Sequence, residues 1–240
     1  MFDLKNFNLR EMTECGIVIR KTGSEATSME ETAQKITGYL YRQLGDIRNG
    51  KNGCALVRLF KTHPYGDLDQ ELKKFANTVL KSEQPSPGMK CLTLLASTGE
   101  LPEWNTRHGS QGHKTIPLAS EKFVLAFPMV SNLIKQFGLE INQVVEPRMD
   151  IILDISQKKY NVFYIPEAAG NQIIPAQDNF VVPFKIKSVL GCGGVFPSGN
   201  LFVLIMFTKV AICSEAAELF KTLALDIKLA LLPFEDQVFK

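Results

Sequence analysis

The sequence has no Cys-x-x-Cys pair, although it contains five cysteines. It also has no apolar run near the ~18 residues that span a membrane, since the longest, LFVLIMF, covers only residues 201–207. The first residues, MFDLKNFNLR, carry charges throughout and lack the apolar region of a secretion signal. We therefore expect reduced thiols, a cytoplasmic location and no membrane as a partner.

Neither sign of charge predominates. The chain has 27 Lys and Arg against 25 Asp and Glu, a formal net charge of +2. Because nucleic-acid binding relies on basic stripes, often interleaved with aromatic residues, we expect no nucleic acid as a partner. With 45% hydrophobic and 22% charged residues, the 240-residue chain is typical of one large globular domain with a substantial core.

Motifs of common enzyme and metal sites are also missing. There is no serine nucleophile elbow and no metalloprotease helix. His108 and His113 are separated by GSQG, which is a weak zinc spacing, so we predict no metal and no catalytic residue. If the protein bound haem, His108 or His113 would be the candidate axial ligand; the cofactor itself stays unknown.

A glycine-rich stretch at 189–200, VLGCGGVFPSGN, raises the question of a phosphate-binding loop. Such a loop needs a helix directly after its glycines. Here the strand-like LFVLIMF follows, and PSGN has turn composition, so the pattern predicts a β-hairpin. Gly191, Gly193 and Gly194 indicate that something approaches the backbone closely. We favour a neighbouring element over the alternative, a small ligand lying on the sheet.

Periodicity predicts four helical regions and six strands. Ser28 and Glu31 form a capping box for the first helix, Asp67 and Gln70 suit the start of the second, and Ser214 caps the last, which ends before Pro233. The helices are expected at 28–44, 67–80, 123–137 (interrupted at Pro128 and stopped by Gly138) and 214–232. The strands are expected at 54–62, 90–97, about 150–156, 160–166, 180–191 and 201–210. A long polar loop occupies 98–118.

The final third combines IKSVLGCGG, the PSGN turn, LFVLIMFTKVAI and CSEAAELFKTLALDIKLAL. Together with SMEETAQKITGYLYRQL and CALVRLF near the start, it resembles the GAF family of bacterial sensory domains, which are related to PAS domains. The resemblance spans residues 28–232. It implies an α+β fold: a central antiparallel sheet, with the N- and C-terminal helices on one face and loops and helices covering the other. The predicted division is an N-terminal extension over 1–27 and a single GAF-like domain over 28–240.

The resemblance implies a cytoplasmic sensory or regulatory domain that binds a small molecule and signals through its terminal helices. It further implies a homodimer through those helices, a separate effector protein, and no catalytic output of its own. One alternative is a thiol-dependent redox enzyme similar to free methionine sulfoxide reductases. The closely spaced cysteines of those enzymes are missing, since residues 92–191 contain none. The other alternative is a ligand-free dimerisation module.

Aromatic and basic residues near the expected mouth of the cavity are the candidate ligand-binding residues. Aromatic faces with a few basic groups suit a planar, anionic ligand. The candidates are Arg58, His63, Tyr65, Trp104, Arg107, His108, Tyr164 and Phe184.

Overall fold

The computed structural model describes residues 1–47, 50–81, 83–146 and 160–239. The strands of its main sheet are β4 (Cys54–Pro64), β5 (Lys90–Gly99), β6 (Thr115–Pro117), β7 (Phe163–Ile165), β8 (Ser188–Val195) and β9 (Leu201–Thr208). They lie in the order β6-β5-β4-β9-β8-β7, and each neighbouring pair is antiparallel. A small second sheet contains β1 (Phe2–Asp3), β2 (Leu44–Asp46) and β3 (Lys51–Asn52).

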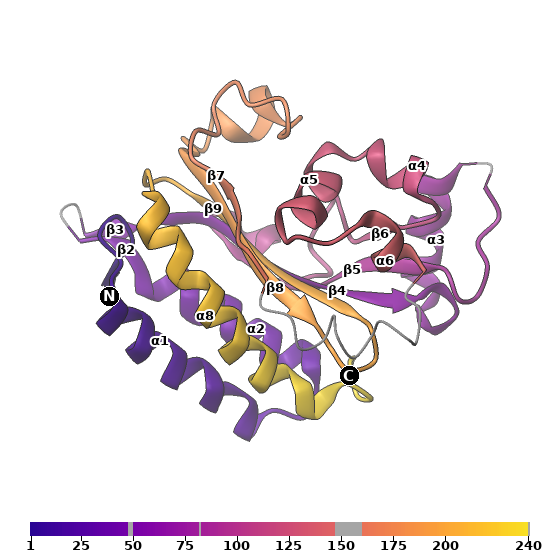
Figure 1. Ribbon diagram of the computed structural model, residues 1–240, viewed down its shortest axis with the longest axis horizontal. Coiled ribbons are helices and arrows are strands. Elements are labelled where there is room, and N and C mark those ends of the chain that lie inside the picture. Colours follow the sequence, from indigo (N-terminus) through magenta and orange to yellow (C-terminus); the bar gives the residue numbers. More distant parts are fainter. Residues whose placement is uncertain (48–49, 82, 147–159, 240) are drawn as a thin grey trace.

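Helices cover both faces of the main sheet. The α-helices are α1 (Leu9–Lys21), α2 (Met29–Gln43), α3 (Gln70–Leu80), α4 (Glu121–Leu125), α5 (Pro128–Gln136), α6 (Ile141–Val145) and α8 (Ser214–Leu231). Short turns are η1 (Thr22–Glu25), η2 (Tyr65–Asp67), η3 (Pro102–Trp104), η5 (Leu232–Phe234) and the π-helical η4 (Gln177–Val181). Figure 1 shows α1, α2 and α8 on one side of the sheet and α4, α5 and α6 on the other. We call these the helix face and the loop face.

Strand alternation divides the core between the two faces. In β4, Val57 and Leu59 pack with α1, α2 and α8, where Phe220 and Ile227 are fully buried. Leu56 and the β9 side chains of Val203 and Phe207 point to the loop face. The arrangement confirms the expected α+β class, an antiparallel sheet with the N- and C-terminal helices on one face.

Most expected elements are present, with shifted ends. Ser28 Oγ accepts from Glu31 N at 3.2 Å, and Pro128 begins α5 as expected. The cap of α3 is Asp69 rather than Asp67, and Cys213 precedes α8, so Ser214 is its first helical residue rather than its cap. The strand expected near 150–156 lies outside the described residues.

Two of the segments that differ from expectation in kind lie at 9–21 and 180–187. Residues 9–21 form α1, which packs on α8 through buried Cys15 and Ile19. Residues 180–187 contain the end of η4 and a turn over 182–185 rather than a strand: Pro183 has no N–H for a ladder, and Lys185 has a φ of 55°. The division into an extension over 1–27 and one domain over 28–240 stays a prediction.

The glycine-rich stretch is a hairpin, as expected. β8 and β9 pair from Ser188↔Thr208 to Val195↔Leu201, and Gly199 in the turn has a φ of 78°. A methyl group on Gly193 would lie 2.2 Å from Phe202 O and 2.9 Å from a ring carbon of Phe137, the residue that ends α5. Close packing by neighbouring elements therefore accounts for this glycine. Among the described residues, no helix is long and apolar enough to cross a membrane.

Candidate functional site

The eight candidate residues separate into two groups and one outlier. Arg58, Trp104 and Phe184 gather on the loop face. His63, Tyr65, Arg107 and His108 lie toward the helix face, near the start of α2 and near α3. Tyr164 is the outlier: it pairs with Leu190 on the helix face, and its hydroxyl donates to Ile212 O.

Arg58 sits in the middle of β4, between Val57 and Leu59, whose side chains point to the helix face. Its guanidinium therefore projects to the loop face, where Nη2 donates to Ser110 Oγ at 3.0 Å. Its neighbours across the sheet are Ser97 of β5 and Ile205 of β9. The site is thus built on the central strand and closed by the long polar loop.

Two polar atoms at this position have no hydrogen-bond partner among the described residues: Arg58 Nε and Ser97 Oγ, both buried. The ion pairs found among the described residues do not include Arg58. Burial lowers the pKa of Arg58 to about 10. An unpaired, largely desolvated cation costs several kcal/mol, which a bound anion would offset.

Aromatic side chains form the wall beside Arg58. The Trp104 ring lies 4.6 Å from Phe184 and 5.6 Å from Phe180 between centroids, and Phe180 meets the Phe207 ring edge-on at 4.9 Å. Phe207 pairs with Leu56, two residues before Arg58 on the same face. The arrangement places a cation next to an apolar aromatic surface.

Ser97 and Ser110, which lie at this position, were not among the candidate residues, and His113 was considered only as a metal or haem ligand. Burial and the charge of Arg58 lower the pKa of His113, so its imidazole lies within electrostatic range of the guanidinium. Its backbone φ of 58° indicates that the loop holds it in an unusual conformation. Ser97 lies opposite Arg58 because of the register between β4 and β5, and composition does not predict that register.

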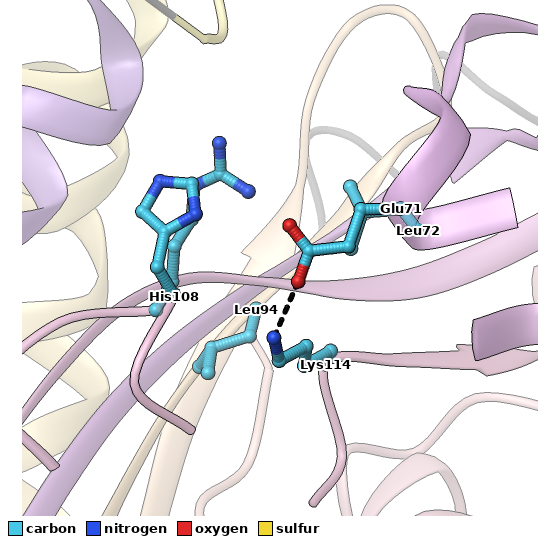
Figure 2. A pocket seen from close by; sticks show the side chains of 6 residues that line it. Glu71, Leu72, Leu94, His108 and Lys114 are labelled. Atoms are coloured by element: carbon cyan, nitrogen blue, oxygen red, sulfur yellow. Dashed lines mark hydrogen bonds and ion pairs between the residues drawn. The ribbon is translucent and has the colours of Figure 1, made fainter. Parts of the chain in front are cut away.

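In the second group the charges of the loop residues are paired. Arg107 Nε donates to Glu30 Oε1 at 2.7 Å, and His108 Nε2 lies 3.8 Å from the same oxygen. Figure 2 shows His108 opposite Glu71 and Leu72 of α3, with Lys114 joined to Glu71 across a narrow pocket. Because these side chains already have partners, this pocket is weaker evidence for a bound ligand than the unpartnered Nε of Arg58.

The cysteines are mostly inaccessible. Cys15, Cys54, Cys91 and Cys192 are buried, and burial raises the pKa of each thiol to about 12. Cys213 is exposed at the start of α8. Because the thiolate is the reactive form, the four buried thiols are poor nucleophiles.

Metal-type donors do not converge in the described part of the chain, where no group of three His, Cys, Asp or Glu side chains could hold an ion. His108 pairs with Glu30 near the start of α2, whereas His113 lies by Arg58. The two histidines therefore belong to different surroundings.

No protein-family model and no curated protein matches the sequence. Among solved structures, the fold is similar to a free methionine-R-sulfoxide reductase from Neisseria meningitidis in complex with its substrate, with 10% identity, 97% of each chain covered and a TM-score of 0.52. A GAF domain from an Acinetobacter phosphoenolpyruvate-protein phosphotransferase matches with 12% identity, 91% of this chain, 92% of that chain and a TM-score of 0.41. At these identities a likeness concerns the fold alone.

The expectation that the protein has no catalytic output is wrong, because it was inferred from a fold that enzymes also use. The same arrangement of strands and helices, over nearly the full length of both chains, serves a sulfoxide reductase. This fold therefore gives no ground for excluding an enzyme.

Proposed function

We propose that the protein binds a small organic anion, such as a carboxylate with an apolar or planar body, on the loop face of its GAF-like sheet. Arg58 and Ser97 would bind the negative group, and Trp104, Phe180 and Phe184 would contact the body. Single cations beside aromatic faces suit ligands of this class. The proposal fits a sensory or regulatory role, and it holds equally for an enzyme that acts on such a molecule.

The observation that carries the proposal is the buried Arg58 Nε without a partner among the described residues. Guanidinium groups bind carboxylates through two parallel hydrogen bonds. In Arg58, Nη2 is engaged by Ser110, while Nε remains available beside the hydroxyl of Ser97. A carboxylate there would complete the hydrogen bonding of both residues.

The test compares thermal unfolding of the intact chain and of Arg58→Met with benzoate, free methionine sulfoxide and a cyclic nucleotide as probes. A ligand at 10 times its Kd stabilises a protein by about 1.4 kcal/mol, which corresponds to about 3–6 °C in Tm. We expect one or more probes to raise the Tm of the intact chain and none to raise that of Arg58→Met. Without a probe, Arg58→Met should melt at a higher temperature, because it removes an unpaired cation.

Arg10→Met is the matched control, since Arg10 is exposed on α1 and pairs only with Glu14. It should keep both the Tm and the probe response of the intact chain. Equal probe responses in the intact chain and in Arg58→Met would contradict the proposal. Mass spectrometry of the denatured protein adds an independent readout, because a co-purified anion should appear with the intact chain and not with Arg58→Met.

We further propose that occupancy is passed to α8 and to a partner subunit or a separate effector. β9 carries Ile205 beside Arg58 and leads directly into α8. Leu225 and Leu229 of α8 and Ile17 of α1 are exposed on the outer side of the helix face, where they suit a homodimer contact. Leu225→Glu should then lower the sedimentation coefficient of the intact chain to that of a monomer, whereas an unchanged value would exclude this surface.

A further inference from the structure

A second group of buried basic residues lies at the far end of β4, on the helix face. Lys61 pairs across the sheet with Phe202, whose side chain belongs to the helix-face core, and His63 follows two residues later on the same face. Lys61 is 2% exposed and His63 is 4% exposed. Neither residue contributes to the Arg58 site, because that site lies on the opposite face.

These side chains are poorly satisfied. His63 Nε2 is buried and has no hydrogen-bond partner among the described residues. Lys61 Nζ has one long contact, 3.5 Å, to the carbonyl oxygen of the adjacent Thr62. Burial, and then the charges of Lys61, Lys90 and Arg107, lower the pKa of His63 well below its ordinary value. The pair therefore places a buried amino group and an unpartnered imidazole nitrogen where the described residues offer few partners.

The start of α2 faces the same place. This 15-residue helix presents its first backbone N–H groups there, and a helix N-terminus attracts anions. Met29 N donates to Gln237 O at 3.0 Å, and Glu30 N donates to Val238 O at 2.9 Å. Residues 235–239, which we call the covering segment, thus occupy the end of α2 with peptide oxygens.

The covering segment also packs against these basic side chains. The ring of Phe239 lies 5.4 Å from the His63 ring between centroids, and its centroid lies 4.6 Å from Arg107 Cζ. The charges of Glu235, Asp67 and Asp236 act on Lys61 and oppose the effects of burial and Lys90 on its pKa. The first turn of α2 also carries two carboxylates: Glu30, which pairs with Arg107, and Glu31, which accepts from Thr27. The segment therefore supplies the oxygens and negative charge that a ligand would otherwise bring.

We infer that Lys61, His63 and the first N–H groups of α2 form a second binding site, for a phosphate-class anion, and that the covering segment occupies it in this structure. A phosphate group fits better than a carboxylate, because the site offers a lysine, an imidazole and two helix N–H groups to one ligand. Three or four oxygens and a charge near −2 match that set of donors.

The experiment titrates inorganic phosphate and glycerol phosphate calorimetrically, at constant ionic strength in chloride. It compares the intact chain with Phe239→Ser and with the double variant Val238→Ser and Phe239→Ser, which removes both apolar anchors of the covering segment. We expect phosphate to bind the double variant at least about 10-fold more tightly than the intact chain. Adding Lys61→Met or His63→Phe should reverse that gain.

Lys74→Met is the matched control, because Lys74 is exposed on α3 and should leave phosphate binding unchanged. Arg58→Met in the double variant should also leave it unchanged, which separates this site from the proposed function.

Binding of both probes points to the phosphate group alone, and binding of glycerol phosphate only points to an organic phosphate. The inference is overturned if the opened variants bind neither probe more tightly than the intact chain, or if Lys61→Met and His63→Phe leave binding intact. If the double variant loses its thermal transition, the comparison of phosphate binding rests on Phe239→Ser, which is the milder change.

Discussion

At the scale of single residues, burial divides the cysteines into two kinds. Four thiols lie in the core, and burial raises the pKa of each to about 12, so almost none is thiolate near neutral pH. Cys213, at the solvent-exposed start of α8, is the accessible thiol. A reductase mechanism that needs an attacking and a resolving thiolate would have to open this core.

Thiol titration of the native protein should therefore detect one fast-reacting thiol, with the other four reacting only on unfolding. Cys213→Ser should remove the fast phase without changing the Tm. A second fast thiol, or consumption of free methionine sulfoxide in the presence of a thiol reductant, would contradict this expectation and support redox chemistry at a cysteine.

Residue types were easier to predict than residue positions. Arg58, Trp104 and Phe184 were expected near one another on chemical grounds, and they gather on the loop face. Tyr164 was expected with them and lies on the opposite face, because the alternation of a strand only three residues long is hard to fix from sequence. Their role in binding stays a prediction.

At the scale of elements, glycine positions fix how closely helices and strands approach. Gly193 in β8 leaves room for Phe202 O and for the Phe137 ring at the end of α5. Gly193→Ala should destabilise the protein by about 3 kcal/mol, the upper part of the range for overpacking, because both neighbours are held by the core. Urea unfolding measures the change.

Gly88→Ala is the control, since a methyl group there would have no atom within 4 Å. It should change the free energy of unfolding by less than about 0.5 kcal/mol. A Gly193→Ala protein as stable as the intact chain would mean that both the β9 backbone at Phe202 and the Phe137 ring can move away from β8.

Helix α1 was not predicted, although its sequence contains a recognisable helix signal. Asn8 and Glu11 form a capping box, with Asn8 Oδ1 accepting from Glu11 N at 3.2 Å. The buried stripe of Met12, Cys15 and Ile19 includes Gly16, which interrupts an otherwise apolar face. α2 and α8 have longer and more continuous stripes, which made them predictable.

At the scale of the whole molecule, the antiparallel order of the sheet follows from strong local signals. Turn residues at 197–200 separate two apolar strands, and short connections favour neighbouring antiparallel strands. The pairing of β4 with β9, by contrast, joins segments about 150 residues apart along the sequence, as Leu59↔Leu204 illustrates. The resemblance to GAF domains predicted an antiparallel sheet but no strand order, so this pairing was not predicted.

Buried bases should make global stability depend on pH. Burial lowers the pKa of Lys61 from 10.5 to about 8 in the folded state, so between these values the unfolded chain holds a proton that the folded chain releases. Stability should thus rise with pH over that window, by up to about 3 kcal/mol. Lys61→Met should be more stable than the intact chain near pH 7 and should show a smaller rise, as measured by urea unfolding at pH 7, 8, 9 and 10.

His63 contributes in the acid range with the same sign. Its folded pKa is depressed, mainly by burial, so stability should fall as pH drops below about 6.5. His63→Phe should flatten that fall, and equal slopes in the two proteins would show that His63 is protonated as readily when folded as when unfolded.

The main sheet ends in two very short strands, β6 at one side and β7 at the other, each of three residues. A foreign strand that docked onto either would find room for only a few ladder hydrogen bonds, and Pro117 withholds its donor on the β6 side. Fibril-like stacking of folded molecules through these margins is thereby discouraged.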